Sequence, residues 1–172
     1  MSEILDNREH ARSLRRRLND HSIDIEVLAL EAMHVFDSAR LATQMHWLNL
    51  ELLGYTSSAQ SSSVHEILGL SAQDRLVIQV KTYRVQPGRL AGGPQAGVAF
   101  HHFFVEPIRQ LVEAQARVRG VPRSLDTVRL DFAVDEAKRD LPTSGEFSVD
   151  TFDRIVLGFR AVLHLQLGPI AQ

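Results

Sequence analysis

Two consecutive amphipathic helices between residues 25 and 53 restrict the folds open to this chain. In the second one, expected from about Ala39 to Leu53, apolar side chains recur every three or four positions and share one helix face. The only tryptophan, Trp47, lies beside that face, and Gly54 suits the conformation that often closes a helix. The pattern predicts an αα-hairpin whose apolar faces must be buried against further elements.

The segment before the hairpin, Ser2 to Asp20, is dense in charge and has few apolar positions. Leu14 and Leu18 lie one helical turn apart, so we expect a short, largely exposed helix that these two side chains dock. Residues 19–22 interrupt it, and either Ser22 or Asp24 caps the next helix.

The second half alternates between strand and helix patterns. β-Branched residues predict a strand over 76–85, followed by a glycine-rich loop over 87–97 and a second strand over 98–105. Pro107 opens a helix over 108–119. A third strand is expected near 128–134, with a helix over 131–139 as the alternative. Ser148 caps a last helix that ends at Gly168, and its buried face is expected to hold Phe152, Ile155, Val156, Phe159, Val162 and Leu163.

These elements predict an α+β fold with an N-terminal αα-hairpin, a small mixed or antiparallel sheet and an amphipathic C-terminal helix. We expect one domain over 1–172, made of the charged helix (1–20), the hairpin (24–55) and the strands and helices of 76–172. A polar loop is expected over 56–63, and residues 65–70 form an apolar patch without a clear pattern.

Composition excludes several classes of protein. The 172 residues include no cysteine, which rules out disulfides, thiolate catalysis and cysteine zinc sites. A net charge of −2 gives no general preference for nucleic acid, and no apolar run is long enough to span a membrane. We therefore expect a cytoplasmic chain, and its length and Met1 favour a stand-alone subunit.

The candidate catalytic residues are Glu51, His101, His102 and Glu106. His101, His102 and Glu106 form the densest group of ligand-type side chains in the sequence. Adjacent residues on a strand point to opposite faces, so the two histidines cannot share one metal ion without distant partners. We predict neither a metal nor a cofactor.

A basic run near the N-terminus consists of Arg12, Arg15, Arg16 and Arg17. Arginines in such a run can contact phosphates, but acidic residues flank these four and no aromatic side chains are interleaved. We favour a partner-facing helix over nucleic-acid binding.

The hairpin resembles the N-terminal part of the AbiTii domain family. The family has an alanine-rich helix followed by a helix ending in a Trp-Leu, Glu-Leu, Gly-Tyr pattern, and this chain departs from it by an extra Leu53 before the Gly-Tyr. The resemblance covers residues 25–55, with a weaker echo over 103–111. The matching residues are Trp47, Leu48, Glu51, Leu52, Gly54 and Tyr55.

The resemblance implies a role in bacterial abortive infection or other anti-phage defence. It suggests packing roles for most of the matching residues, while Glu51 is expected to pair with an arginine or to accept backbone donors. The expected function is protein–protein assembly, as a homo-oligomer or with a companion protein of the same system. The alternative is a toxin enzyme, a nuclease or nucleotide-directed hydrolase using Glu51, His101 or His102, and Glu106. Membrane perturbation by the last helix is a third, weaker reading.

Overall fold

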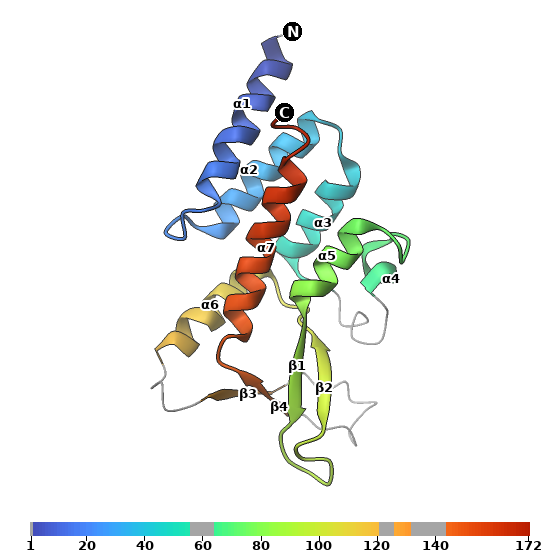
Figure 1. Cartoon of the computed structure of the whole chain (residues 1–172), viewed down its shortest axis with the longest axis vertical. Coiled ribbons are helices and arrows are strands. Elements are labelled where there is room, and N and C mark those ends of the chain that lie inside the picture. Colours follow the sequence, from blue (N-terminus) through green and yellow to red (C-terminus); the bar gives the residue numbers. More distant parts are fainter. Residues whose placement is uncertain (1, 56–63, 121–125, 132–143) are drawn as a thin grey trace.

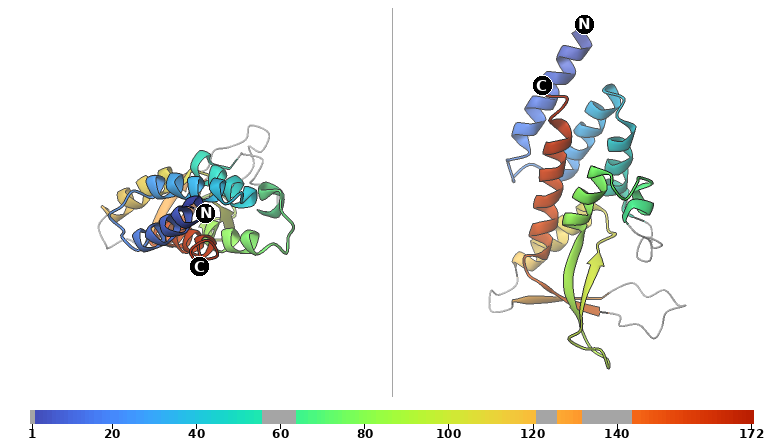
Figure 2. Two further views of the ribbon diagram at one scale, coloured as in Figure 1. Left: turned by 90° about the horizontal axis from the view of Figure 1, so that it is seen from above. Right: turned by 45° about the vertical axis from the view of Figure 1, so that its right-hand side comes forward.

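The structure is a computed structural model that describes residues 2–55, 64–120, 126–131 and 144–172. These residues form seven helices and four strands, which confirms the α+β class. Figure 1 shows the helices grouped at one end of the molecule and the sheet at the other. The helix α7 (Thr151–Leu167) runs along the helical part between α1 (Ser2–Arg17) and α5 (Arg75–Arg84) in both Figure 1 and Figure 2.

The predicted hairpin is present as α2 (Ile25–Ser38) and α3 (Ala42–Leu53). Of the two proposed caps, Asp24 is the one used, because its side chain accepts a hydrogen bond from the backbone N–H of Glu26 at 2.7 Å. Gly54 ends α3 with φ of 89°, a value that suits glycine. The charged helix α1 docks on α2 and α7 through Ala11, Leu14 and Leu18, which are all buried.

The strand predicted over 76–85 is wrong. Asp74 caps a helix there by accepting a hydrogen bond from the N–H of Leu76, and α5 follows. The buried positions of α5 recur with helical spacing, whereas Ile78, which the alternating pattern placed beside Leu76 and Val80, is exposed. Packing of this face against α3 and α7 overrides the β-branched composition. The apolar patch before it contains the short helix α4 (Val64–Leu68).

The sheet is antiparallel throughout its described part, in the order β2-β1-β4-β3. Its strands are β1 (Val85–Leu90), β2 (Ala99–Phe103), β3 (Thr127–Asp131) and β4 (Ser144–Ser148). The second and third predicted strands are thus confirmed, but the loop predicted over 87–97 is wrong in its first part, and β4 was not predicted. The strand β1 contains Gly88, where a Cβ atom would come 2.7 Å from the Phe147 ring of β4. The close approach of this ring therefore requires glycine at position 88.

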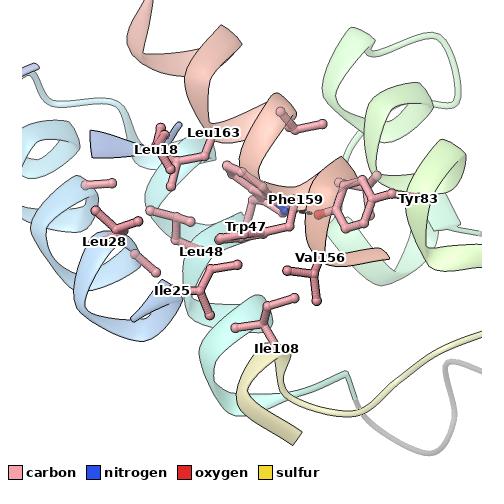
Figure 3. Close-up of a cluster of buried hydrophobic side chains, with 14 of the residues drawn as sticks. Leu18, Ile25, Leu28, Trp47, Leu48, Tyr83, Ile108, Val156, Phe159 and Leu163 are labelled. Atoms are coloured by element: carbon pink, nitrogen blue, oxygen red, sulfur yellow. Dashed lines mark hydrogen bonds between the residues drawn. The ribbon is translucent and has the colours of Figure 1, made fainter. Parts of the chain in front are cut away.

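The last two helices follow the sequence closely. The helix α6 (Ile108–Arg119) starts after Pro107 and ends at Gly120. Asp150 rather than Ser148 holds the N-cap position of α7, although the Asp150 side chain makes no capping hydrogen bond and Ser148 Oγ accepts the N–H of Asp150 at 3.3 Å. The predicted buried face is entirely confirmed. This face joins the side chains of α2, α3 and α5 in one core (Figure 3).

Two sequence-based predictions, the loop over 56–63 and the strand or helix after residue 131, lie outside the described residues. Within the described ranges, no helix combines the length and the apolar character that crossing a bilayer requires.

Candidate functional site

A buried polar cluster lies between α3 and α5 and consists of Glu51, Tyr55, Tyr83 and Arg84. The Oε1 atom of Glu51 accepts hydrogen bonds from the hydroxyls of Tyr55 at 2.5 Å and Tyr83 at 2.7 Å. Its Oε2 atom pairs with Nη2 of Arg84. Neither charged side chain is exposed. The prediction that Glu51 meets an arginine is confirmed.

Arg84 connects the buried polar cluster to the segment between β2 and α6. Its Nη1 atom donates to the carbonyl oxygens of Phe104 at 2.9 Å and Glu106 at 2.8 Å. Its guanidinium lies 5.1 Å from the ring centroid of Tyr55. One arginine thus connects α5, the end of α3 and the entry to α6.

Burial and mutual charge set the protonation states of the cluster. Burial, and then the Glu51 carboxylate, raise the pKa of Tyr83 well above its ordinary value, and the same two causes raise that of Tyr55. Burial, the largest cause, lowers the pKa of Arg84, but Glu51, Tyr55 and Tyr83 together outweigh burial, so its pKa is raised. Both phenols stay protonated as hydrogen-bond donors, and Arg84 stays charged.

The residues that carry the AbiTii resemblance meet at this cluster. The indole Nε1 of Trp47 donates to the Tyr83 hydroxyl at 3.0 Å (Figure 3). The N–H of Tyr55 donates to the carbonyl of Val105 at 2.7 Å, and a Cβ at Gly54 would come 2.9 Å from the Pro107 ring. The weaker echo over 103–111 therefore packs directly against the end of the hairpin.

The cluster is suited to holding helices together rather than to catalysis. Both oxygens of Glu51 are occupied by donors of the protein, and the side chain is closed to solvent. A general base needs an open lone pair within reach of a substrate proton, which Glu51 does not offer here.

The side chains of the other candidate catalytic residues make no hydrogen bond to Glu51. His101 is exposed on β2, and His102 points to the opposite face, where its ring lies 4.8 Å from that of Phe104 and 5.9 Å from that of Phe147. Burial lowers the pKa of His102 to about 4. Glu106 approaches the cluster only through its carbonyl, and its buried Oε2 atom has no hydrogen-bond partner among the described residues.

Metal ligation has no obvious place in the described ranges. No three histidine, aspartate or glutamate side chains gather there closely enough to hold an ion.

The basic run of α1 is divided between two neighbours. Arg17 turns toward α2 and pairs with Glu31. Arg12 donates from Nε to the carbonyl of Ala171 at 2.7 Å, beyond the end of α7. Arg15 lies near His164 of α7, where its charge, together with burial as the larger cause, lowers the histidine pKa. Arg16 is exposed.

Arg8 completes what we call the arginine row: Arg8, Arg12 and Arg15, spaced i, i+4 and i+7 on one side of α1. Within the described chain, no carboxylate lies within 4 Å of these guanidinium groups, unlike that of Arg17. The Nε atoms of Arg8 and Arg15 are shielded from water and have no acceptor there.

The helix α7 carries an outward face made of Leu157, Ala161 and Leu165, and the arginine row begins level with the C-terminal end of this face. Leu157 is 49% exposed and Leu165 is 50% exposed, although both belong to a helix whose other side is core. Their spacing of four residues places the three side chains on one line along the helix. We call these residues the α7 face.

Tyr83 and Arg84 were missed as partners of Glu51 because residues 76–85 were taken for a strand. Asp74 as a cap, followed by apolar residues at 76, 77, 80 and 83, is the signal that would have indicated a helix. The residues of the α7 face could not be specified from the sequence because exposure on one side of a helix depends on the tertiary neighbours of that side.

Searches of protein-family models, curated proteins and solved structures find no match for this chain.

Proposed function

We propose that this chain is an assembly module of a bacterial anti-phage system of the abortive-infection type, acting in the cytoplasm through protein–protein contact. The defence context comes from the resemblance of residues 25–55 to the AbiTii domain family. The mode of action comes from the surface, where half-exposed leucines lie near arginines that have no ion pair among the described residues.

One observation carries the proposal: the α7 face is half exposed, and at its C-terminal end begins an arginine row that has no carboxylate within 4 Å among the described residues. Isolated surface leucines are ordinary, but two on one helix line beside unpaired arginines are typical of a contact surface.

The toxin alternative has less support. An active site needs its acid, base and nucleophile within hydrogen-bond reach of one substrate. Glu51 is enclosed and fully bonded, and His101 and His102 point to opposite faces of β2.

The test is the mass of the purified chain by light scattering, alone and mixed with the purified products of adjacent genes. We expect a defined oligomer or a stable complex at about 100 µM. A chain that stays monomeric and binds none of these products would contradict the proposal. Phage plating on cells with and without the gene tests the defence context separately.

A further inference from the structure

We infer that two copies of this chain pair through the outer edge of β2, antiparallel and about a two-fold axis at His101, so that their two sheets join into one. This pairing is one form of the assembly proposed above, on which it rests. It names the partner as a second copy of the chain and the contact as a pair of strands.

The strand β2 lies at an edge of the sheet. In the described part of the chain it pairs with β1 alone, and Figure 1 shows β1, β4 and β3 following one another on its other side. An edge strand presents a row of backbone N–H and C=O groups that another strand can bond. The natural partner of this edge is therefore an extended backbone.

The hydrogen bonds to β1 show which residues of β2 face outward. Just beyond β2, the N–H of Phe104 donates to the carbonyl of Arg84 at 3.1 Å, so the even-numbered residues bond β1. In antiparallel strands, successive residues direct their backbone groups alternately to the two sides. The residues that turn their N–H and C=O groups to the outer edge are therefore Ala99, His101 and Phe103.

Tyr55 already occupies the continuation of this edge. Its N–H donates to the carbonyl of Val105 at 2.7 Å, and its ring lies 5.0 Å from that of Phe103. Val105 follows Phe103 by two residues and so faces the same side. The outer edge thus accepts a backbone donor, and a second strand can extend along it only as far as Phe103.

This limit selects the register of the pair. With the axis at His101, Ala99 of one copy lies opposite Phe103 of the second copy, and the two His101 residues lie opposite each other. Each of these three residue pairs exchanges two hydrogen bonds, which gives about six across the interface. Every outward backbone group of β2 is then bonded.

The turn before β2 keeps the two copies clear of Tyr55. In this register Gly97 of the second copy would lie opposite Val105. Gly97 has a φ of 85°, and its N–H donates to the carbonyl of Leu90 at 2.8 Å, so the chain turns back toward its own β1 there. Each β2 therefore fits between the two Tyr55 residues, which favours a second copy over an unrelated strand.

The side chains of β2 permit such self-pairing. The strand contains no charged residue and no proline, whereas the other edge strand, β3, carries Arg129 and Asp131, and charges hinder pairing at an edge. Across the two-fold axis, Phe100 would face His102 of the second copy. These two side chains already form an aromatic contact within one chain, with ring centroids 6.4 Å apart.

The size of the contact sets the expected affinity. A pair of five-residue strands buries less than the roughly 1,200 Å² at which stable interfaces begin. We therefore expect a reversible dimer with a Kd of about 10–100 µM, measured by sedimentation equilibrium of the full chain.

A single introduced thiol tests the register. The chain has no cysteine, so His101→Cys supplies the only thiol. Residues directly opposite in such a hydrogen-bonded pair have Cα atoms about 5.5 Å apart, a distance that a disulfide spans. Mild oxidation should give a covalent dimer about tenfold faster than in Thr127→Cys, which places the thiol on the exposed strand β3.

A charge exchange tests the two-fold axis. His101→Lys and His101→Glu each put like charges directly opposite, which should raise the dimer Kd about threefold to tenfold. An equimolar mixture of these two variants, carrying different fluorophores, should form a mixed dimer at least as tightly as the parent chain. Thr127→Lys on β3 should leave the Kd unchanged.

A proline tests the backbone bonds. The N–H of His101 points away from β1, where its neighbour is Pro87, so His101→Pro removes an outward donor without removing a bond to β1. We expect a monomer that keeps the circular dichroism of the parent chain. If this variant does not fold, the charge exchange still decides the question.

Several results would overturn the inference. These are a parent chain that stays monomeric at about 300 µM, equal oxidation of the two cysteine variants, or a charge-exchanged mixture that pairs no better than its components. If His101→Pro instead abolishes a complex between a monomeric chain and a companion protein, the edge binds a strand of that companion. An oligomer that survives all three His101 changes overturns this inference and leaves the proposed function standing.

Discussion

Gly158 of α7 touches Tyr83 of α5, and the Cβ atom of Tyr83 occupies the space that a side chain at Gly158 would need. This close approach lets the Tyr83 hydroxyl reach both the indole of Trp47 and the carboxylate of Glu51. A glycine in the middle of α7 thus sets the position of the buried polar cluster.

Replacement of Gly158 by alanine should therefore destabilise the fold. Alanine favours a helix by about 1 kcal/mol over glycine, but the overlap with Tyr83 must separate α5 from α7. We expect a net loss of about 1–3 kcal/mol in the free energy of unfolding, measured with chemical denaturant. Gly120→Ala is the control: its nearest neighbour to a new Cβ lies 3.4 Å away, so the change should be small. Equal effects at both positions would refute the packing argument.

Removal of one partner of the Glu51–Arg84 pair should be among the most damaging changes. Glu51→Leu leaves the Arg84 guanidinium charged and enclosed, and we expect a loss of about 3–5 kcal/mol in the free energy of unfolding. The double variant Glu51→Leu/Arg84→Met should lose much less than the sum of the two single variants, since no lone charge remains.

An exposed ion pair provides the comparison for that experiment. Arg109 and Glu113 lie one turn apart on α6 and are both exposed. Glu113→Gln should change the free energy of unfolding by less than about 0.5 kcal/mol. Additive losses for Glu51 and Arg84 would mean that the two side chains act independently, against the geometry described above.

Arg160 holds the turn between α1 and α2. Its guanidinium donates to the carbonyl oxygens of Leu18 at 3.0 Å, Asp20 at 3.1 Å and Ile23 at 2.7 Å. Arg160→Met should lower the free energy of unfolding by about 2–4 kcal/mol and increase hydrogen exchange in α1 first. Arg154→Met, on the exposed side of the same helix, should do neither. Uniform loss of protection across all helices would contradict a local role for Arg160.

Stability should fall with acidification because of His102. Burial lowers its pKa from 6.5 to about 4, so between these values the unfolded chain binds a proton that the folded chain does not. The free energy of unfolding therefore rises with pH between pH 4 and 6.5. The contribution of His102 to this free energy is lost as the pH falls from 6.5 toward 4. Burial and Arg15 lower the pKa of His164, which adds an effect of the same sign.

The His102→Phe variant tests this assignment by denaturation at a series of pH values. Phenylalanine suits the aromatic surroundings and does not titrate, so the slope between pH 4 and 6.5 should become flatter. His101→Gln, at the exposed neighbouring position, should keep the slope of the parent chain. An unchanged slope in His102→Phe would show that other groups cause the acid sensitivity.

Helix faces were predictable where periodicity and burial coincide, as in α7, whose six expected core residues are all buried. Residues 75–90 were misread because the chain passes from α5 into β1 between Arg84 and Val85 without a glycine or proline to mark the change. Pro87 and Gly88 then suggested a loop, although Gly88 is required by the nearby Phe147 ring. Contacts between segments distant in the sequence determine both the helix α5 and the strand β1. Local sequence patterns carry no information about such contacts.

In the candidate site, too, the sequence predicted individual residues but not their tertiary partners. Glu51 stood out in the sequence and indeed meets an arginine, but its partner lies 33 residues away in the segment taken for a strand. The arginines of α1 were recognised as a group, yet only the tertiary structure separates Arg17, which has a carboxylate, from Arg12 and Arg15, which have none in the described chain.

The enclosed pair of Glu51 and Arg84 also constrains how sequences related to this one can diverge. A lineage that loses one charge passes through a chain with a lone ion in its interior, so the two positions should be inherited together or replaced together. Joint variation of positions 51 and 84, with tyrosine retained at 55 and 83 only where both charges persist, would then trace this architecture in distant relatives whose surfaces no longer resemble it.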